Sequence, residues 1–558
     1  MEIRKNDVYT VKIEDLSTDG SGIGKVDGYT LFVKDALIGD LAEVKVIKTK
    51  KNYGYGRLMR ILEPSPDRVE APCPLARSCG GCQIQHLSYE RQLAFKENKV
   101  RNLLDRVGKI EDYIMHPIIG MENPYYYRNK AQYPVGVGKD GQIVTGFYAG
   151  HSHVIVDSSR CYIQAPVNEQ ILEIVKKWMT EYHIRPYDEN THQGLVRHIL
   201  TRVGFKTGEI MVCLIINGKK LPYALELSER LQVIDGMTSI SYNINTEKTN
   251  VILGDKVVTV WGQDYITDYI GDVKYQISPL SFYQVNPVQT EKLYKAALDF
   301  ANPGPEDVIW DLYCGIGTIS LFMAQKAKQV YGVEIVPQAI EDAKRNAAIN
   351  GIKNAEFYVG KAEEVLPKTY EEKHIHADII VVDPPRKGCE ESLLACITEM
   401  QPKRVVYVSC DPATLARDLK YLEGRGYKVE EVQCVDMFGH SVHVESIVLL
   451  SHKSPDSTIN IKVEFGEGEG KVPLDAIAER AKKYQPKPKI TYKMIQEYVE
   501  KKYGFKVHTA YIAEVKRSLG LTMYDAPNAV EKLRQPRKRP PKEKVEAITE
   551  ALKYFEVI

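Results

Sequence analysis

One short segment sets the architecture expected for this chain: Val405-Val406-Tyr407-Val408-Ser409-Cys410-Asp411-Pro412. The β-branched, apolar residues at its start predict a buried strand. Asp411 and Pro412 then predict a helix start, with the aspartate as the N-cap and the proline at the first helical position.

Cys410 lies between the predicted strand and the predicted helix. The positive end of a helix dipole favours the thiolate form of a cysteine, whereas the neighbouring carboxylate of Asp411 opposes it. A lone cysteine at a strand end can also be a small buried residue without a chemical role. The motifs that surround Cys410 favour the first interpretation, in which it is a nucleophile.

Strands and helices alternate around this segment. Strands are predicted at 308–312, 329–334, 355–359, 379–382, 404–408, 428–435 and 444–450, with helices near 317–327 and 337–350. Such alternation is typical of a doubly wound sheet with helices on both faces. Residues 271–454 are therefore expected to form a Rossmann-like α/β domain.

A glycine turn follows the first of these strands: Asp311-Leu312-Tyr313-Cys314-Gly315-Ile316-Gly317-Thr318. Glycines there let the backbone approach a ligand closely. The third glycine of the dinucleotide fingerprint is absent, which disfavours a pyrophosphate ligand. Glu334 ends the next strand, where a carboxylate can accept hydrogen bonds from both hydroxyls of a ribose. Together these features suggest S-adenosylmethionine.

The segment Asp383-Pro384-Pro385-Arg386 follows the fourth strand. Enzymes that methylate exocyclic amines place an aromatic residue after the two prolines, whereas this chain has Arg386 there. An amine target is therefore disfavoured, and a ring carbon becomes the candidate. A thiolate that adds to C6 of uracil makes C5 able to take a methyl group, and a base must then remove the C5 proton.

Cys410 can supply that thiolate, and Glu445, which enters the last predicted strand, is the candidate base. A carboxylate partly buried in a strand has a raised pKa, which suits a base that must later release its proton. A structural salt bridge is the alternative role for Glu445.

Four cysteines upstream form a candidate metal site. Cys73, Cys79 and Cys82 are separated by five and two residues, and Cys161 is the best candidate for a fourth ligand. Such a set can bind zinc or a [4Fe–4S] cluster, and the spacing alone does not choose between them. Unrelated buried thiols are the remaining interpretation.

Residues 1–64 are expected to form a small, OB-like β-barrel. Strands are predicted at 8–13, 31–33, 41–47 and 55–61, punctuated by Gly20, Gly22, Gly24 and Gly28. Lysines and arginines interleave with Tyr53 and Tyr55, a combination that suits single-stranded RNA but also an ordinary solvated barrel face. With Gly39-Asp40, the pattern resembles the TRAM domain, an RNA-binding barrel.

Pro64-Ser65-Pro66 predicts a linker after the barrel. Residues 65–270 are expected to form a central α+β domain that carries the cysteines, and residues 130–265 alternate like an antiparallel sheet interrupted by helices.

The composition is that of a globular protein. The 558 residues include 75 Lys and Arg against 74 Asp and Glu, a net charge of +1 that leaves room for local basic patches. No apolar run reaches transmembrane length, and the first residues lack the apolar core of a signal peptide. A cytoplasmic monomer without disulfides is expected.

Residues 455–558 are expected to form a separate basic extension. Residues 466–470 predict a flexible linker, and helices at 491–503 and 509–519 weakly resemble a helix-turn-helix module. The densest basic run spans 534–542. We interpret this tail as an auxiliary RNA-binding module, with a charged, solvated appendage as the alternative.

Four motifs make the chain similar to the RNA uracil-5-methyltransferase family: Ser-Cys-Asp-Pro-x-Thr-Leu-x-Arg-Asp from Ser409, Asp-Pro-Pro-Arg from Asp383, Ser-Pro-x-Ser-Phe-x-Gln-x-Asn from Ser278, and His-x-Glu ending at Glu445. The resemblance covers residues 1–452 and implies Cys410 as nucleophile and Glu445 as general base. It also implies cofactor contacts from Gln284, Tyr313, Glu334 and Asp383, stacking of a flipped uracil on Phe282, and a [4Fe–4S] cluster on Cys73, Cys79, Cys82 and Cys161.

The iron–sulfur branch of that family modifies 23S ribosomal RNA, so C5-methylation of uridine in that RNA is the expected function. The barrel and the cysteines favour it over transfer RNA, the alternative substrate, because the bacterial transfer-RNA branch typically lacks both. A non-catalytic iron–sulfur RNA-binding protein is the alternative of a different class. One departure from the family is Gly439, where proline is usual, and it bears on the rigidity of that loop.

Overall fold

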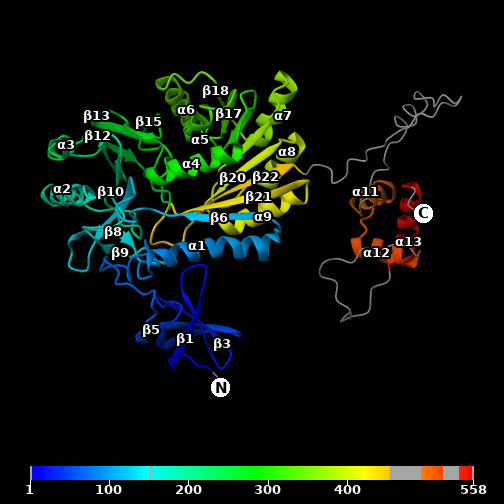
Figure 1. The fold of residues 1–558 in the computed structure, drawn as a ribbon, viewed down its shortest axis with the longest axis horizontal. Helices are drawn as coiled ribbons and strands as arrows, with labels where there is room; N and C mark the ends of the chain where they lie inside the picture. Colours follow the sequence, from blue (N-terminus) through cyan, green and yellow to red (C-terminus); the bar gives the residue numbers. More distant parts are fainter. Residues whose placement is uncertain (1–2, 151, 453–491, 520–539, 556–558) are drawn as a thin grey trace, which may run out of the picture. The chain divides into compact units, whose positions relative to one another are not determined.

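The computed structural model describes residues 3–150, 152–452, 492–519 and 540–555 (Figure 1). The chain divides into two units, Met1–Thr458 and Ile459–Ile558, and each is described by itself. Within the described ranges, no helix is both long and apolar enough to cross a lipid bilayer.

An eight-stranded sheet forms the centre of the first unit, in the spatial order β18-β17-β16-β19-β20-β22-β21-β6 (Figure 1). Its strands are β6 (Ile114–Ile119), β16 (Val308–Leu312), β17 (Gln329–Glu334), β18 (Ala355–Val359), β19 (Ile379–Val382), β20 (Arg404–Ser409), β21 (Tyr427–Val435) and β22 (Glu445–His452). β16 to β20 are parallel, whereas β22 runs antiparallel to both β20 and β21. All seven strands predicted for the Rossmann-like region are present.

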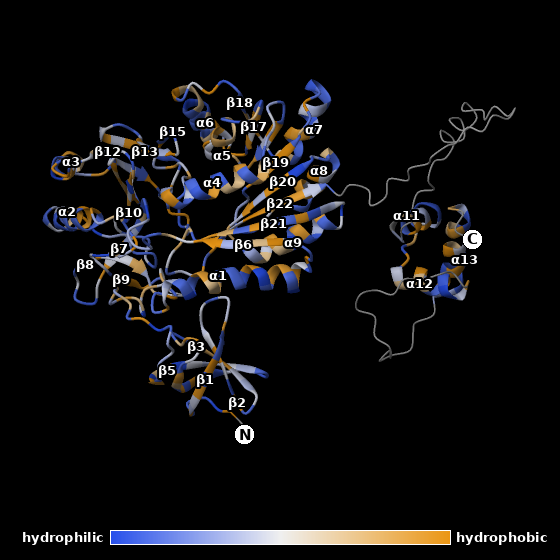
Figure 2. Cartoon of the chain, in the orientation of Figure 1, coloured by the Kyte–Doolittle hydropathy of each residue, from blue (hydrophilic) through white to orange (hydrophobic). Residues whose placement is uncertain are grey.

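The central strands β16, β19, β20 and β22 are buried on both faces, as expected from their largely apolar sequences (Figure 2). Val406 and Val408 of β20 point into one core, which they share with α4 (Pro287–Ala301), α5 (Thr318–Met323) and α6 (Pro337–Ile349). Val405 and Tyr407 alternate with them and point into the opposite core. The helices of that second core are α1 (Tyr89–Leu103), α7 (Ala362–Lys373), α8 (Glu391–Met400) and α9 (Pro412–Glu423).

Part of this layer comes from far upstream in the chain. α1, the π-helical turn that continues it (Leu104–Gly108) and β6 all lie in the sequence predicted as the central domain. In the structure α1 and the turn contact α9, and β6 pairs in parallel with β21 at the sheet edge. His116 Nε2 lies 2.7 Å from Glu431 Oε2 across that pair. Residues before 120 therefore help to build the layer that carries Cys410.

A second sheet has seven strands in the order β13-β12-β11-β10-β7-β8-β9. They are β7 (Lys130–Val137), β8 (Ile143–Tyr148), β9 (Ile155–Asp157), β10 (Val196–Val203), β11 (Ile210–Ile216), β12 (Met237–Ile244) and β13 (Lys256–Gly262). The alternating sequence predicts an antiparallel sheet, but β11 and β12 are parallel. The helix α3 (Ala224–Leu231) crosses between them, as a parallel pair requires, and with α2 (Asn168–Glu181) it covers one face.

A hairpin of β14 (Ile266–Ile270) and β15 (Val273–Ile277) follows the second sheet. Its apolar residues join Leu200, Met211 and Cys213 of the second sheet in the core that α4 shares with the first sheet. The two sheets are therefore connected by one continuous apolar core.

The N-terminal segment is a closed barrel with the strand order β1-β2-β3-β5-β4. Its strands are β1 (Val8–Leu16), β2 (Gly22–Val26), β3 (Tyr29–Lys34), β4 (Leu41–Thr49) and β5 (Tyr53–Glu63). The sequence predicts four of them and misses β2, whose glycines resemble turn residues. Barrel closure explains those glycines, because a Cβ on Gly24 would lie 2.4 Å from Val11 Cγ1, and one on Gly56 would lie 2.2 Å from Val44 Cγ1.

The carboxylate of Asp40, which is fully buried, ties the barrel to the segment after it. It accepts hydrogen bonds from Leu37 N (2.7 Å) and Ser65 N (2.8 Å) and pairs with Arg68 (2.5 Å). Burial alone would raise the pKa of Asp40, but Arg68 and the two amides hold it below its ordinary value. Pro64-Ser65-Pro66 is therefore not a free linker, since Ser65 is only 4% exposed and is held against the barrel.

The described part of the C-terminal unit contains α11 (Tyr492–Tyr503), α12 (Thr509–Ser518) and α13 (Lys542–Tyr554). The first two are the helices predicted from the sequence, and α13 is additional. Ile495, Val499, Ile512 and Ile548 belong to an apolar core shared by all three. The predicted linker at 466–470 and most of the basic run at 534–542 lie outside the described residues.

We expect Asp40→Asn to destabilise the barrel by about 2 kcal/mol, because Arg68 would lose its buried partner. A carboxyl whose pKa is lowered by folding contributes stability above its unfolded pKa, and this contribution is lost as the pH falls through the folded pKa. Hydrogen exchange of the barrel amides should therefore differ from wild type at neutral pH and less at about pH 3. Glu43→Gln, which removes an exposed pair with Arg60, is the control. Equal effects of the two variants would contradict the role of Asp40.

Candidate active site

Cys410 and Glu445 occupy opposed positions at the end of two paired strands. β20 and β22 are antiparallel, and their last pair joins Ser409 to Ser446. The next residue after β20 is Cys410, and Glu445 precedes Ser446, so the two side chains start from directly opposite backbone positions on one face. Glu445 is 3% exposed, whereas Cys410 is partly exposed. A partly exposed thiol therefore faces a buried carboxyl.

The helix after Cys410 begins as the sequence predicts. Asp411 is the N-cap of α9, and its Oδ1 accepts hydrogen bonds from Ala413 N (2.9 Å) and Thr414 N (3.2 Å). Pro412 follows in the first helical turn. The turn that carries the thiol is thus fixed by a strand on one side and a capped helix on the other.

The surroundings disfavour ionisation of both groups. Burial raises the pKa of Cys410 to about 12, and the charges of Glu445 and Asp383 add to the rise, while Arg386 opposes it. Burial also raises the pKa of Glu445 to about 8, again with a contribution from Asp383 and opposition from Arg386. The raised pKa predicted for Glu445 is confirmed. The expectation that the thiolate form of Cys410 is favoured is wrong, because burial raises the pKa of this thiol.

The turn after β16 has the backbone of a ligand-binding loop. Tyr313, Gly315 and Gly317 have φ angles of 71°, 54° and 81°, a region that suits glycine and is uncommon for tyrosine. Glu334, at the end of β17, accepts hydrogen bonds from Gly315 N (3.3 Å) and Val336 N (3.0 Å). These amides hold the carboxylate beside the turn, and its remaining lone pairs can accept hydrogen bonds from a ribose.

Two charged residues of the site were not singled out as functional from the sequence. Asp311 lies fully buried behind the turn, where Ser320 Oγ donates to its Oδ2 at 2.5 Å, and its Oδ1 has no hydrogen-bond partner among the described residues. Burial raises the pKa of Asp311 to about 7, and the charges of Asp383 and Glu334 add to it. The second residue is Arg386, whose positive charge opposes the rise in pKa at both candidate catalytic residues, Cys410 and Glu445. An acid that ends a buried strand before a glycine turn is the signal that could have identified Asp311.

The Asp383 loop is fastened to α9 by another buried acid. Asp418 is fully buried, and its Oδ2 accepts hydrogen bonds from Tyr407 OH (2.6 Å) and Cys389 N (2.8 Å). Its Oδ1 pairs with Arg417 at 2.7 Å. The helix that follows the candidate nucleophile therefore also holds the loop that follows Asp383.

In the segment 278–286, the side chain of Phe282 is exposed and that of Gln284 is buried. Phe282 is 68% exposed, whereas Gln284 is 7% exposed. Ser281 Oγ donates to Asp342 Oδ2 (3.0 Å), and Asn129 Nδ2 donates to the Gln284 carbonyl (2.9 Å). The segment is thus anchored on both sides of an exposed aromatic ring that can stack on a base.

The four candidate metal ligands come into one neighbourhood. Cys82 and Cys161 pack against the same small apolar cluster. Burial raises the pKa of Cys161 to about 11, and the nearby Cys79 and Cys73 add to that rise. Among the residues that the structure describes, however, no three cysteine, histidine or acidic side chains are arranged to hold a metal ion. The thiols suit zinc or an iron–sulfur cluster as donors, but their arrangement here is not a closed ligand set.

Comparisons with known proteins address the class of this site. A family model described as tRNA (Uracil-5-)-methyltransferase matches residues 237–453, and one described as TRAM domain matches residues 4–59. An uncharacterized RNA methyltransferase of Halalkalibacterium halodurans is 54% identical over 453 residues, which are 81% of this chain and 98% of that protein. One from Clostridium tetani is 50% identical over 451 residues, which are 81% of this chain and 97% of that protein.

Among solved structures, Pyrococcus abyssi tRNA (uracil-54, C5)-methyltransferase in complex with S-adenosyl-L-homocysteine has a TM-score of 0.63 and 28% sequence identity. The match covers 79% of this chain and 100% of that one. Fold and site together define an RNA methyltransferase that uses S-adenosylmethionine. The chain belongs to the RNA uracil-5-methyltransferase family and carries a TRAM domain at its N-terminal end.

Glu445→Gln should stabilise the fold, and more so at higher pH. A carboxyl whose pKa is raised to about 8 by burial binds its proton more tightly in the folded state than in the unfolded state. Stability therefore falls as the pH rises from the unfolded pKa toward the folded one, and glutamine escapes this loss. The gain in Tm should widen between about pH 5 and about pH 8.

Glu430→Gln is the matched control for this measurement, because the hydroxyl of Ser451 holds the pKa of Glu430 below its ordinary value. Its effect on Tm should have the opposite sign. A gain for Glu445→Gln that stays constant with pH would contradict the assigned burial effect.

Proposed function

We propose that the protein methylates C5 of a uridine in 23S ribosomal RNA through a covalent bond between Cys410 Sγ and C6 of the base. The observation that carries the proposal is the opposition of Cys410 and Glu445 across β20 and β22. Addition to C6 needs a nucleophile, and the later removal of the C5 proton needs a base on the same side of the reaction centre. A partly exposed thiol facing a buried carboxyl meets both needs.

The proposed reaction consists of an addition, a methyl transfer and an elimination. Cys410 loses its thiol proton to solvent as Sγ bonds to C6, and the C5=C6 electron pair moves toward C5 and O4. S-adenosylmethionine, held at the glycine turn, would supply the methyl group that C5 then bonds, with its methyl–sulfur bond breaking and S-adenosylhomocysteine leaving. The carboxylate of Glu445 takes the C5 proton, the C5=C6 double bond re-forms, and Sγ leaves C6. Because the pKa of Glu445 is raised to about 8, it holds and releases this proton near neutral pH.

Four residues are proposed to hold the methyl donor: Gln284, Tyr313, Glu334 and Asp383. Glu334 is supported by its fixed position beside the glycine turn, and Tyr313 by the left-handed backbone that forms that turn. Burial raises the pKa of Asp383 to about 7, so part of its population can donate a hydrogen bond at neutral pH. Phe282, exposed on an anchored segment, is proposed to stack on the flipped uracil.

The barrel supports an RNA substrate bound beyond the active site. Phe32, Tyr53 and Tyr55 form one aromatic group, with ring centroids 5.7 to 5.9 Å apart, and the two tyrosines are 36% and 39% exposed. Exposed rings that interleave with lysine and arginine suit unpaired bases and their phosphates. Lys34 of the same barrel donates to the Arg77 carbonyl (3.1 Å), next to the cysteines.

Transfer RNA is the second candidate substrate. The likeness to the Pyrococcus abyssi enzyme over 79% of this chain favours it, whereas the combination of barrel and cysteines favours ribosomal RNA.

RNA that carries 5-fluorouridine tests both the chemistry and the target. Fluorine cannot leave C5 as a proton does, so the proposed adduct should persist as a denaturant-stable complex in the presence of S-adenosylmethionine. We expect trapping on 23S ribosomal RNA and none on transfer RNA treated in parallel. Cys410→Ala should abolish trapping, and Cys396→Ala, which alters a buried thiol of α8, should not. Trapping that survives Cys410→Ala would overturn the mechanism, and trapping on transfer RNA alone would overturn the target.

We also propose that Cys73, Cys79, Cys82 and Cys161 bind a [4Fe–4S] cluster. The proximity of the thiols and their chemistry as soft donors support the assignment, since Cys82 and Cys161 pack against the same apolar cluster. Protein purified without oxygen should be brown and contain iron and sulfide, and Cys161→Ser should lose both. Cys396→Ser, a buried thiol of α8, is the control. A colourless protein that contains zinc would contradict the cluster.

A further inference from the structure

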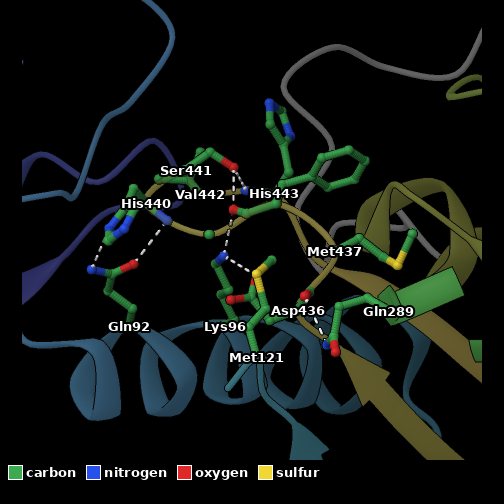
Figure 3. Close-up of polar contacts among 12 residues, drawn as sticks. Gln92, Lys96, Met121, Gln289, Asp436, Met437, His440, Ser441, Val442 and His443 are labelled. Carbon is green, nitrogen blue, oxygen red and sulfur yellow. Dashed lines mark hydrogen bonds and ion pairs between the residues drawn. The ribbon is translucent and has the colours of Figure 1, made fainter. Parts of the chain in front are cut away.

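The loop between β21 and β22 leads directly into Glu445, the candidate base opposite Cys410. It spans residues 436–444 and is drawn in Figure 3. Side chains of α1 and α4 donate hydrogen bonds to the backbone of this loop, although both helices lie far from it in the sequence. The loop that precedes the candidate base is therefore held by residues outside the two strands that it joins.

The central contact is a buried ion pair between α1 and the start of this loop (Figure 3). Lys96 and Asp436 are both fully buried, and Lys96 Nζ lies 2.5 Å from Asp436 Oδ1. Lys96 Nζ also donates to the Phe438 carbonyl at 2.9 Å, and Tyr89 OH donates to Asp436 Oδ2 at 2.8 Å. Burial lowers the pKa of Lys96 although Asp436 opposes the shift. One ammonium group thus binds two points of the loop without solvent.

A second residue of α1, Gln92, grips the loop four residues further along. Its Oε1 accepts a hydrogen bond from His440 N (3.0 Å), and its Nε2 lies 3.2 Å from His440 Nδ1 (Figure 3). His440 has a φ of 66°, a conformation that costs energy in a residue other than glycine and persists only where its surroundings impose it. The grip of Gln92 supplies that constraint.

The opposite side of the loop is held as well. Gln289 Nε2 of α4 donates to the Asp436 carbonyl (3.1 Å), and Asn286 Nδ2 donates to the Met437 carbonyl (3.2 Å). Tyr127 OH donates to the carbonyl of Gly439 (3.1 Å), the position where proline is usual in the family. These hydrogen bonds provide the rigidity that the glycine does not.

We propose that Lys96 is a positioning residue for the reaction: by binding Asp436 and the Phe438 carbonyl, it fixes the 436–444 loop and so keeps Glu445 opposite Cys410. The inference rests on the proposed function and extends it to a residue of α1. Stability alone is a weak reason for such a pair, because desolvation of two buried charges offsets most of their attraction. An apolar pair of similar volume would fill the space, but it would not bind the loop carbonyl.

The test separates the base step from the steps before it. Trapping on 5-fluorouridine RNA needs Cys410 and methyl transfer but no proton removal, whereas turnover on uridine RNA needs all three. The full-length variant Lys96→Met with Asp436→Asn removes both charges and leaves an acceptor for Tyr89. We expect its trapping rate to stay within about twofold of wild type, and its turnover to fall roughly 10- to 100-fold. The unfluorinated adduct should accumulate during turnover.

Three further variants complete the design. Lys96→Arg keeps a cation and should restore most of the turnover. Gln92→Leu removes the second grip and should reduce turnover in the same direction if the double variant does not fold. Arg68→Met breaks a buried pair elsewhere in the molecule, with Asp40, and should leave the ratio of turnover to trapping unchanged.

The outcomes are distinct. A wild-type protein that neither traps nor methylates RNA overturns the proposed function itself. Wild-type trapping with an unchanged ratio in the double variant and in Gln92→Leu overturns the role of Lys96. Equal losses of trapping and turnover that follow the loss of Tm would show a purely structural ion pair and would also overturn it.

Discussion

The antiparallel register between β20 and β22 is the constraint on which the candidate active site depends. With Ser409 opposite Ser446, Cys410 and Glu445 start from facing backbone positions. A slip of one residue would send one of these side chains to the other face of the sheet. Burial of the sheet on both sides prevents such a slip, because Val405 and Tyr407 fill one core while Val406 and Val408 fill the other. The packing of the sheet therefore fixes which two side chains face each other at its end.

The same burial gives the site its electrostatic character. Asp311, Asp383 and Glu445 all have pKa values raised chiefly by loss of hydration, and the charge of Asp383 raises the pKa values of the other two further. Three acids with raised pKa values at one end of a sheet lower the stability of the fold at neutral pH, and such groups concentrate at functional sites. The apolar packing on both faces of the sheet offsets this loss of stability. The positive charge of Arg386 also reduces it, because it opposes the rise in the pKa of Glu445.

Much of this arrangement could be predicted from the sequence, because it is recorded in short segments. The central strands of the eight-stranded sheet are largely apolar runs bounded by turn residues, and Cys410, Glu334 and Asp383 each follow or end a predicted strand. Features that depend on contacts distant in sequence escaped prediction. The parallel pairing of β11 with β12, the glycine-rich β2 and the entry of β6 into the sheet are of this kind. From the sequence, Lys96 is an ordinary charged residue of a predicted helix, because its partner Asp436 lies 340 residues away.

The placement of β6 affects how the chain can be synthesised. His116 and Glu431, which meet across the edge pair, are 315 residues apart. β6 leaves the ribosome long before its partner has been translated, and an unpaired strand edge is open to association with other chains. A nascent polypeptide of this design needs shielding, by its own α1 or by a chaperone, until β21 emerges. The sheet that carries Cys410 is therefore completed only after β21 has been translated. Translation that stops before β21 would leave β6 unpaired and the product prone to aggregation.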